Sequence, residues 1–168
     1  MMSEKQQFEN NWDREYLITM KVLKAYPEGQ QNWKPHEKSK SAIELAWTIA
    51  AEEKTFVDGM ISGKIDFSKS PKVPATFKEA LAGIEKFHAE SSKKFKNIDE
   101  EELNKTMKFM VAKNKMMDVR KMDLMYGLLM DEVHHRGQFS VYVRMAGGKV
   151  PSIYGPSADE PWTEALTA

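Results

Sequence analysis

A long helical stripe near the C-terminus constrains this chain more than any other feature of its sequence. Leu124, Leu128, Asp131, His135 and Phe139 recur at intervals of three or four residues, which places them on one face of an α-helix. Burying an ionisable group in such a face is costly unless the group is paired or bound to a metal. The stripe therefore predicts a helix that is either held by a buried ion pair or built around a site.

Three further segments show the same helical periodicity. The first precedes Pro27 and carries one apolar stripe through Phe8, Trp12, Tyr16, Met20 and Leu23. The second and third each open with the spacing of a capping box, at Ser41 with Glu44 and at Thr76 with Glu79. Four amphipathic helices without a convincing strand pattern predict an all-α fold, a four-helix bundle.

The connections of this bundle are expected to be longer than the short links usual in bundles. Residues 97–104 predict a short turn of helix, and the alternation over residues 106–117 leaves an extended segment open. The last helix is expected to begin at an N-cap, Asp118, and to stop at Gly147 and Gly148. After it, residues 149–168 predict an ordered C-terminal tail, because Tyr154 and Trp162 are worth burying.

The length and composition of the chain limit the kinds of protein it can be. The length of 168 residues suits a single domain, residues 1–168. Lys+Arg and Asp+Glu both number 25, and this balance argues against a nucleic-acid partner, which needs a basic excess. The chain has no cysteine, which excludes disulfides, thiolate metal sites and a cysteine nucleophile. No apolar run is long enough for a membrane span, so we expect a cytoplasmic protein.

Asp131 and His135 lie one helical turn apart and are both expected to point into the bundle. A carboxylate and an imidazole at this spacing can share a divalent cation, with a third ligand from another helix. The alternative is a buried Asp131–His135 ion pair that orients the helix. His134 is rotated by about 100° from His135, so it is expected at the surface or behind the ligands.

Three stretches of the sequence, residues 38–47, 134–142 and 147–157, resemble the DinB-like family (DNA-damage-inducible, YfiT-like). The resemblance implies a four-helix bundle, often a homodimer. It also implies a divalent metal, usually zinc or nickel, held by three histidines: one from the second helix and two, four residues apart, from the last. Relatives include transferases that attach bacillithiol, mycothiol or glutathione to small electrophiles, and many members have no assigned activity.

Carried over to this sequence, the family's three ligand positions fall on Thr48, Asp131 and His135. One histidine is kept, one is replaced by an oxygen ligand, and one by a threonine, which binds zinc weakly. Glu52 or Glu53, about one turn after Thr48, could replace it as a ligand if the bundle brings either close. Partial or complete loss of the metal is favoured over that replacement.

Two functions follow from the resemblance. The first is a metal-dependent transferase of low-molecular-weight thiols to small electrophiles, or a hydrolase-like enzyme, with a partly degenerate metal site. The alternative is a non-catalytic DinB-like protein with a metal-free ligand-binding or structural cavity. Two other residues are interpreted from the pattern: His88 as a hydrogen-bonded core histidine, and Arg136 as a group that holds the tail, holds a partner subunit or faces solvent.

Overall fold

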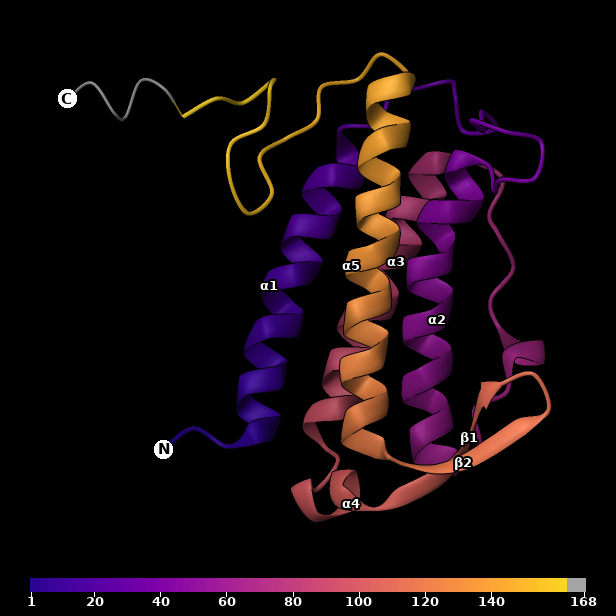
Figure 1. Ribbon diagram of the computed structural model, residues 1–168, viewed down its shortest axis with the longest axis vertical. Coiled ribbons are helices and arrows are strands. Elements are labelled where there is room, and N and C mark those ends of the chain that lie inside the picture. The colour runs from indigo at the N-terminus through magenta and orange to yellow at the C-terminus, as the bar shows by residue number, and fades with distance from the viewer. Residues whose placement is uncertain (163–168) are drawn as a thin grey trace.

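Four long helices form a bundle in the computed structural model, which describes residues 1–162. The long helices are α1 (Glu4–Lys24), α2 (Ala42–Ser62), α3 (Phe77–Lys96) and α5 (Lys121–Met145). The helix α5 packs against α1 and α2, and α3 packs against α2 and α1 (Figure 1). The predicted four-helix bundle is thereby confirmed.

The smaller elements occupy the longer connections. They are a 3₁₀ turn η1 (Phe67–Lys69), a short helix α4 (Glu100–Asn104), and the strands β1 (Thr106–Ala112) and β2 (Lys115–Arg120). The strands form an antiparallel hairpin at the end of the bundle where α2 ends and α5 begins (Figure 1). Residues 106–117, for which the sequence left an extended segment open, lie mostly in these two strands, and the hairpin is a small addition to an otherwise helical fold.

Local sequence signals set most helix ends. The hydroxyls of Ser3, Ser41 and Thr76 cap α1, α2 and α3 in complete capping boxes. Gly147, at a φ of 83°, follows the end of α5 in the left-handed conformation that glycine adopts without strain. The predicted N-cap at Asp118 is wrong. Asp118 belongs to β2, where its Oδ2 lies 2.7 Å from Lys108 Nζ, and Arg120 precedes the first turn of α5.

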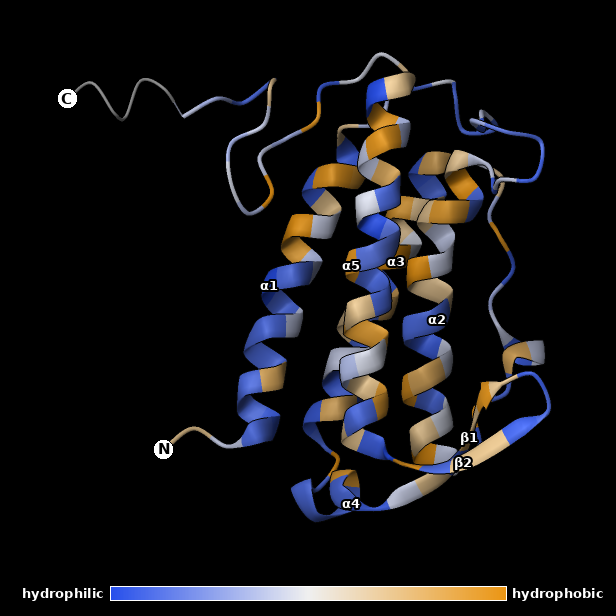
Figure 2. Cartoon of the chain, in the orientation of Figure 1, coloured by the Kyte–Doolittle hydropathy of each residue, from blue (hydrophilic) through white to orange (hydrophobic). Residues whose placement is uncertain are grey.

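The interior consists of two apolar clusters with polar residues between them, and each of the four long helices carries both hydrophobic and hydrophilic residues along its length (Figure 2). One cluster surrounds Leu23, Ala46, Ile84 and Phe139, and the other surrounds Trp12, Val57, Phe95 and Leu128. The intervening turns carry buried polar side chains, which we call the polar layer: Glu15, Thr19, Glu53, Thr55, His88, Ser91, Ser92, Glu132 and Arg136. Buried polar groups of this kind need partners across the bundle.

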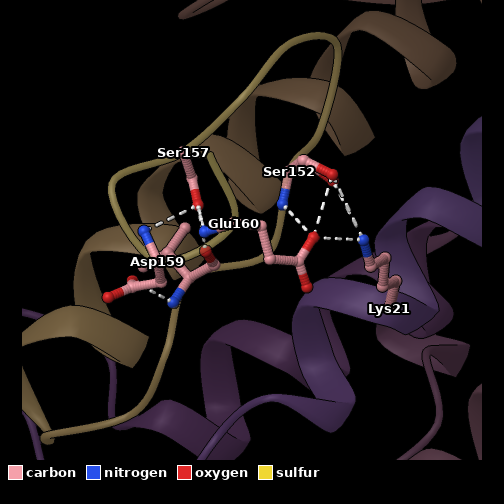
Figure 3. A network of polar contacts seen from close by, with 6 residues as sticks. Lys21, Ser152, Ser157, Asp159 and Glu160 are labelled. Carbon is pink, nitrogen blue, oxygen red and sulfur yellow. Dashed lines mark hydrogen bonds and ion pairs between the residues drawn. The ribbon is translucent and has the colours of Figure 1, made fainter. Parts of the chain in front are cut away.

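The tail after α5 folds back along α1 and is fixed by polar contacts. Lys21 Nζ lies 2.7 Å from Glu160 Oε2, which also accepts hydrogen bonds from the backbone and hydroxyl of Ser152 (Figure 3). Asp159 accepts from the backbone N–H of Val150 at 2.8 Å. The tail is thus ordered as far as the structure describes it. Tyr154 and Trp162 are 63% and 51% exposed, contrary to the expectation of burial, and residues 163–168 lie outside the described range.

Among residues 1–162, no helix combines the length and apolar character needed to cross a membrane. Whether residues 1–168 form one domain, and whether two copies assemble, stay predictions.

Candidate metal centre

Three potential ligands, Glu52 of α2 and Asp131 and His135 of α5, converge at the contact between the two helices. One ligand atom from each lies within 4.8 Å of the others. His135 Nε2 is 3.4 Å from Asp131 Oδ2 and 3.7 Å from Glu52 Oε2. The one-turn spacing within α5 brings Asp131 to His135, and the packing of α2 beside α5 adds Glu52.

The ring of His135 is oriented by its second nitrogen. His135 Nδ1 lies 3.2 Å from Gln138 Oε1, an acceptor three residues along the same helix. When Nδ1 donates its proton to this oxygen, the lone pair of Nε2 is directed toward the two carboxylates. Histidine ligands are commonly fixed in this way by a hydrogen bond to the nitrogen that does not bind the metal.

The three ligands lie in a half-buried groove rather than in the centre of the bundle. The side chains of Asp131, Glu52 and His135 are 47%, 27% and 16% exposed. The expectation that Asp131 points inward is therefore wrong. The residues on the inner face of α5 are Glu132 and Arg136, each one position after the residue predicted to point inward. They continue the buried stripe from Leu128 to Phe139.

The electrostatics of the groove favour a bound cation. Burial and the neighbouring Asp131 carboxylate raise the pKa of Glu52 to about 8, and the positive charge of Lys40 opposes this rise. Two carboxylates placed against one another repel when both are ionised. A proton or a divalent cation between them relieves that repulsion, and a cation can also use the imidazole nitrogen.

Thr48 lies one turn before Glu52 on α2, and its hydroxyl already has two partners. Its Oγ1 donates to the backbone carbonyl of Glu44 at 2.8 Å and accepts a short hydrogen bond from Lys40 Nζ. Thr48 as a ligand stays a prediction. No helical spacing links Lys40 to Thr48, because Lys40 precedes the N-cap of α2, so this contact could not be predicted from the sequence.

A cavity of about 500 Å³ opens beside the centre, and His135 forms part of its wall. Leu45, Val141 and Tyr142 give this cavity an apolar side, and Lys40 and Gln138 give it polar groups. A wall of mixed character beside a metal centre suits a small organic ligand.

Glu53, the other carboxylate considered as a replacement ligand, faces the bundle interior. Its Oε2 lies 3.1 Å from His88 Nδ1, and both side chains are buried. His88 also stacks on Tyr16, with ring centroids 3.8 Å apart. The interpretation of His88 as a hydrogen-bonded core histidine is confirmed, and Glu53 belongs to the polar layer.

Arg136 is buried and holds the tail. Its Nη1 lies 2.7 Å from Glu15 Oε2, and its Nη2 donates a short hydrogen bond to the Tyr154 hydroxyl. Tyr154 in turn donates to the same Glu15 oxygen at 2.5 Å. The contact joins α1, α5 and the tail one residue away from the ligand His135.

Comparison with known families identifies the chain. The model of the DinB family matches residues 1–165. The chain belongs to the DinB family. Among curated proteins, no match to it was found.

Solved structures agree on the fold. A DinB-like protein from Bacillus cereus has a TM-score of 0.76 and 20% identity, covering 92% of this chain and 100% of its own. A DinB-like protein from Bacillus subtilis has a TM-score of 0.72 and 19% identity, covering 88% and 96%. A conserved protein from Enterococcus faecalis has a TM-score of 0.58 and 19% identity, covering 87% and 98%. At these identities the similarity establishes the fold alone.

Proposed function

We propose that this DinB-family protein binds one divalent cation through Glu52, Asp131 and His135 and uses it to activate a small thiol. The proposal is supported by one observation above all: ligand atoms of three different side chains lie within 4.8 Å of one another beside a cavity. Two carboxylates and one imidazole are a donor set that zinc, nickel and manganese accept. Glu52 takes over the place that the family pattern gives to a histidine at position 48.

The residues have distinct tasks in this proposal. His135 would hold the cation through Nε2, with Gln138 fixing the ring, and Glu52 and Asp131 would each supply one oxygen. A bound divalent cation supplies a Lewis acid that lowers the pKa of a thiol or water. The cavity of about 500 Å³ would hold the electrophile against this centre, with Leu45 and Val141 excluding water.

The reaction class we propose is transfer of a low-molecular-weight thiol to a small electrophile. The thiol proton would pass to solvent, the sulfur would form a bond to the electrophilic carbon, and the bond from that carbon to the leaving group would break with its electron pair going to the leaving group. No cysteine of the chain competes as a nucleophile. The thiol and the electrophile would both be small molecules, in keeping with the size of the cavity.

Metal analysis tests the first step. Protein stripped with a chelator, reloaded with zinc, nickel or manganese and dialysed is expected to retain about one equivalent of one of these metals. His135→Ala should lose the metal. His134→Ala is the matched control, because His134 is the adjacent imidazole on the exposed side of α5 and should leave the metal bound.

An assay of thiol transfer tests the second step. The loaded protein is mixed with glutathione, cysteine or bacillithiol and a chromogenic electrophile such as 1-chloro-2,4-dinitrobenzene. Turnover that requires both the metal and His135 supports the proposal. Metal retention without turnover for any of the thiols would leave a metal-binding protein and reject the transferase.

One observation favours a second function, a metal-free protein that binds a small ligand. The ammonium of Lys40 reaches Thr48, at the position where the family pattern has a metal-binding histidine, and its charge acts on Glu52. The chain therefore supplies its own cation near the carboxylates. Wild-type protein that takes up none of the three metals, with its fold intact, would favour this function.

A further inference from the structure

We propose that Lys40, together with Lys34 and Lys38, binds the anionic group of a small substrate, a carboxylate or a phosphate, beside the candidate metal centre. The claim that the bound anion is part of a substrate rests on the proposed function, whereas the binding of the anion itself needs no metal. The arrangement places an anion-binding residue between two cavities, one of which contains His135.

Lys40 is an exposed residue whose ammonium reaches the buried Thr48 hydroxyl, and its charge acts on Glu44 and Glu52 without an ion pair to either carboxylate. It donates to the Thr48 hydroxyl, whose own proton goes to the carbonyl of Glu44. Within residues 1–162, Lys40 forms no ion pair with a carboxylate, in contrast to Lys54 and Lys94, which both pair with Asp58. A lysine ammonium has three N–H donors, so two remain for a ligand.

The backbone that carries Lys40 is fixed before any ligand arrives. Its carbonyl accepts from the Tyr142 hydroxyl of α5 at 3.0 Å. The preceding loop is tied to the start of α2, where Ala42 N–H donates to the Trp33 carbonyl at 2.9 Å. Binding groups held in place in advance lose less entropy when they bind.

A second cavity, of about 510 Å³, continues from Lys40 on the side away from His135. Lys34, Lys38 and Lys40 line it, and Glu44 is the one carboxylate in its wall. The Glu44 carboxylate is already occupied by Ser41, because its Oε2 accepts from the Ser41 backbone at 2.7 Å and from the hydroxyl at 2.9 Å. The lining therefore has three lysines against one carboxylate, which leaves an excess of positive charge.

Apolar residues form another part of this cavity wall. Trp47, Ala51, Pro71 and Val73 line it, and the Trp47 indole N–H is already bonded to the Pro71 carbonyl at 2.9 Å. A wall that combines lysines with an aromatic ring suits a molecule with an anionic end and an apolar body.

The two cavities share Ser39 and Lys40 as a common wall. A substrate whose anionic group is bound by Lys40 therefore lies next to the cavity that contains His135. Lys40 would hold the molecule while the chemistry takes place at its other end, and binding energy from a remote group is a common way to orient a reacting centre.

The test uses the whole chain, stripped of metal, and two probes: inorganic phosphate and phenylacetate. Titrations followed by ¹H–¹⁵N NMR should shift the backbone amides of residues 38–48. Lys40→Met should weaken binding about tenfold, the usual scale for one charge-assisted hydrogen bond, and Lys40→Arg should restore most of it. Lys113→Met is the control, because Lys113 is an exposed lysine in the turn of the hairpin.

Shifts with phosphate alone, or with phenylacetate alone, each support the proposal and identify the anion. The proposal is overturned if neither probe shifts these amides, or if Lys40→Met binds both as the wild type does. It is also overturned if Lys113→Met weakens binding as much, because that result would mean diffuse attraction to lysines.

A crossed pair of variants separates this proposal from the metal site. His135→Ala should lose the metal yet bind the anion, and Lys40→Met should keep the metal yet lose the anion. Anion binding by a protein that takes up no metal would reject the proposed function and leave this inference standing.

Discussion

Glu52 and Glu53 are neighbours on α2, yet they serve different parts of the molecule. Glu52 lies 3.7 Å from His135 in the groove between α2 and α5, whereas Glu53 lies 3.1 Å from His88 inside the bundle. The same offset recurs on α5, where Asp131 is followed by buried Glu132 and His135 by buried Arg136. Every ligand of the candidate centre is thus anchored next to a residue of the polar layer.

The pKa of Glu52 predicts how metal binding depends on pH. Burial and the Asp131 carboxylate raise that pKa to about 8, so below pH 8 an incoming cation must displace a proton from Glu52. The affinity for nickel should therefore rise about tenfold between pH 7 and pH 9. Calorimetric titrations at these two pH values measure the change.

Glu52→Gln provides the control for this pH dependence. The amide cannot ionise, so the variant should bind nickel more weakly and lose most of the rise between pH 7 and pH 9. A variant that keeps the full rise would show that another group controls metal binding.

Glu132→Gln should stabilise the fold at alkaline pH. Burial and the Glu53 carboxylate raise the pKa of Glu132 to about 7, above its ordinary value of 4.5. Because the folded state holds this proton more tightly than the unfolded state, the contribution is full below pH 4.5 and is lost as pH rises through 7. Glutamine avoids this loss, so the variant should gain up to about 3 kcal/mol at pH 8.

Urea unfolding of the wild type and the Glu132→Gln variant at pH 5 and pH 8 measures this difference. Glu101→Gln, an exposed carboxylate on α4, is the matched control and should leave the pH dependence unchanged. Equal stability differences at the two pH values would contradict the assignment of a raised pKa to Glu132.

The helices of this protein could be predicted from sequence because their signals are local. Apolar stripes located the four long helices, and the capping boxes at Ser41 and Thr76 fixed the beginnings of two of them. The ligand pair Asp131 and His135 was also local, since both residues lie on adjacent turns of one helix.

The rest of the candidate site depended on contacts between helices. Which of Glu52 and Glu53 meets α5 is decided by the rotation of α2 against its neighbours, and no spacing within α2 reveals it. The inner face of α5 was misplaced by one residue because burying Arg136 requires Glu15 from α1 and Tyr154 from the tail. Residues so far apart in sequence leave no periodic signal.

The buried ion pair of Arg136 and Glu15, with its hydrogen bonds to the Tyr154 hydroxyl, should be a major source of stability. Burial by itself raises the pKa of Glu15, but hydrogen bonds from Tyr154 and Arg136 bring it below its ordinary value. Tyr154→Phe removes two hydrogen bonds to charged groups, the one accepted from Arg136 and the one donated to Glu15, and should cost about 2 kcal/mol. Arg136→Met leaves the buried Glu15 carboxylate with only the Tyr154 hydroxyl and the exposed Arg14 as partners, and it should cost about 3–5 kcal/mol.

A double-mutant cycle separates this contact from general damage to the fold. Adding Glu15→Gln to Arg136→Met removes the buried charge that has lost Arg136, so the double variant should be more stable than the sum of the single effects predicts. Additive losses in urea unfolding would show that Glu15 and Arg136 do not depend on one another.

Two helical glycines should respond oppositely to replacement by alanine. At Gly137 a Cβ would meet nothing within 4 Å, so Gly137→Ala should stabilise α5 by about 0.5–1 kcal/mol through the lower backbone entropy of the unfolded chain. At Gly83 a Cβ would lie 2.5 Å from the Trp47 ring, which is held by its hydrogen bond to Pro71. Gly83→Ala should therefore lower the melting temperature, whereas Gly137→Ala should raise it by about 1–4 °C. Calorimetric melting of both variants measures the two shifts, and a stabilised Gly83→Ala variant would mean that Trp47 can move away from α3.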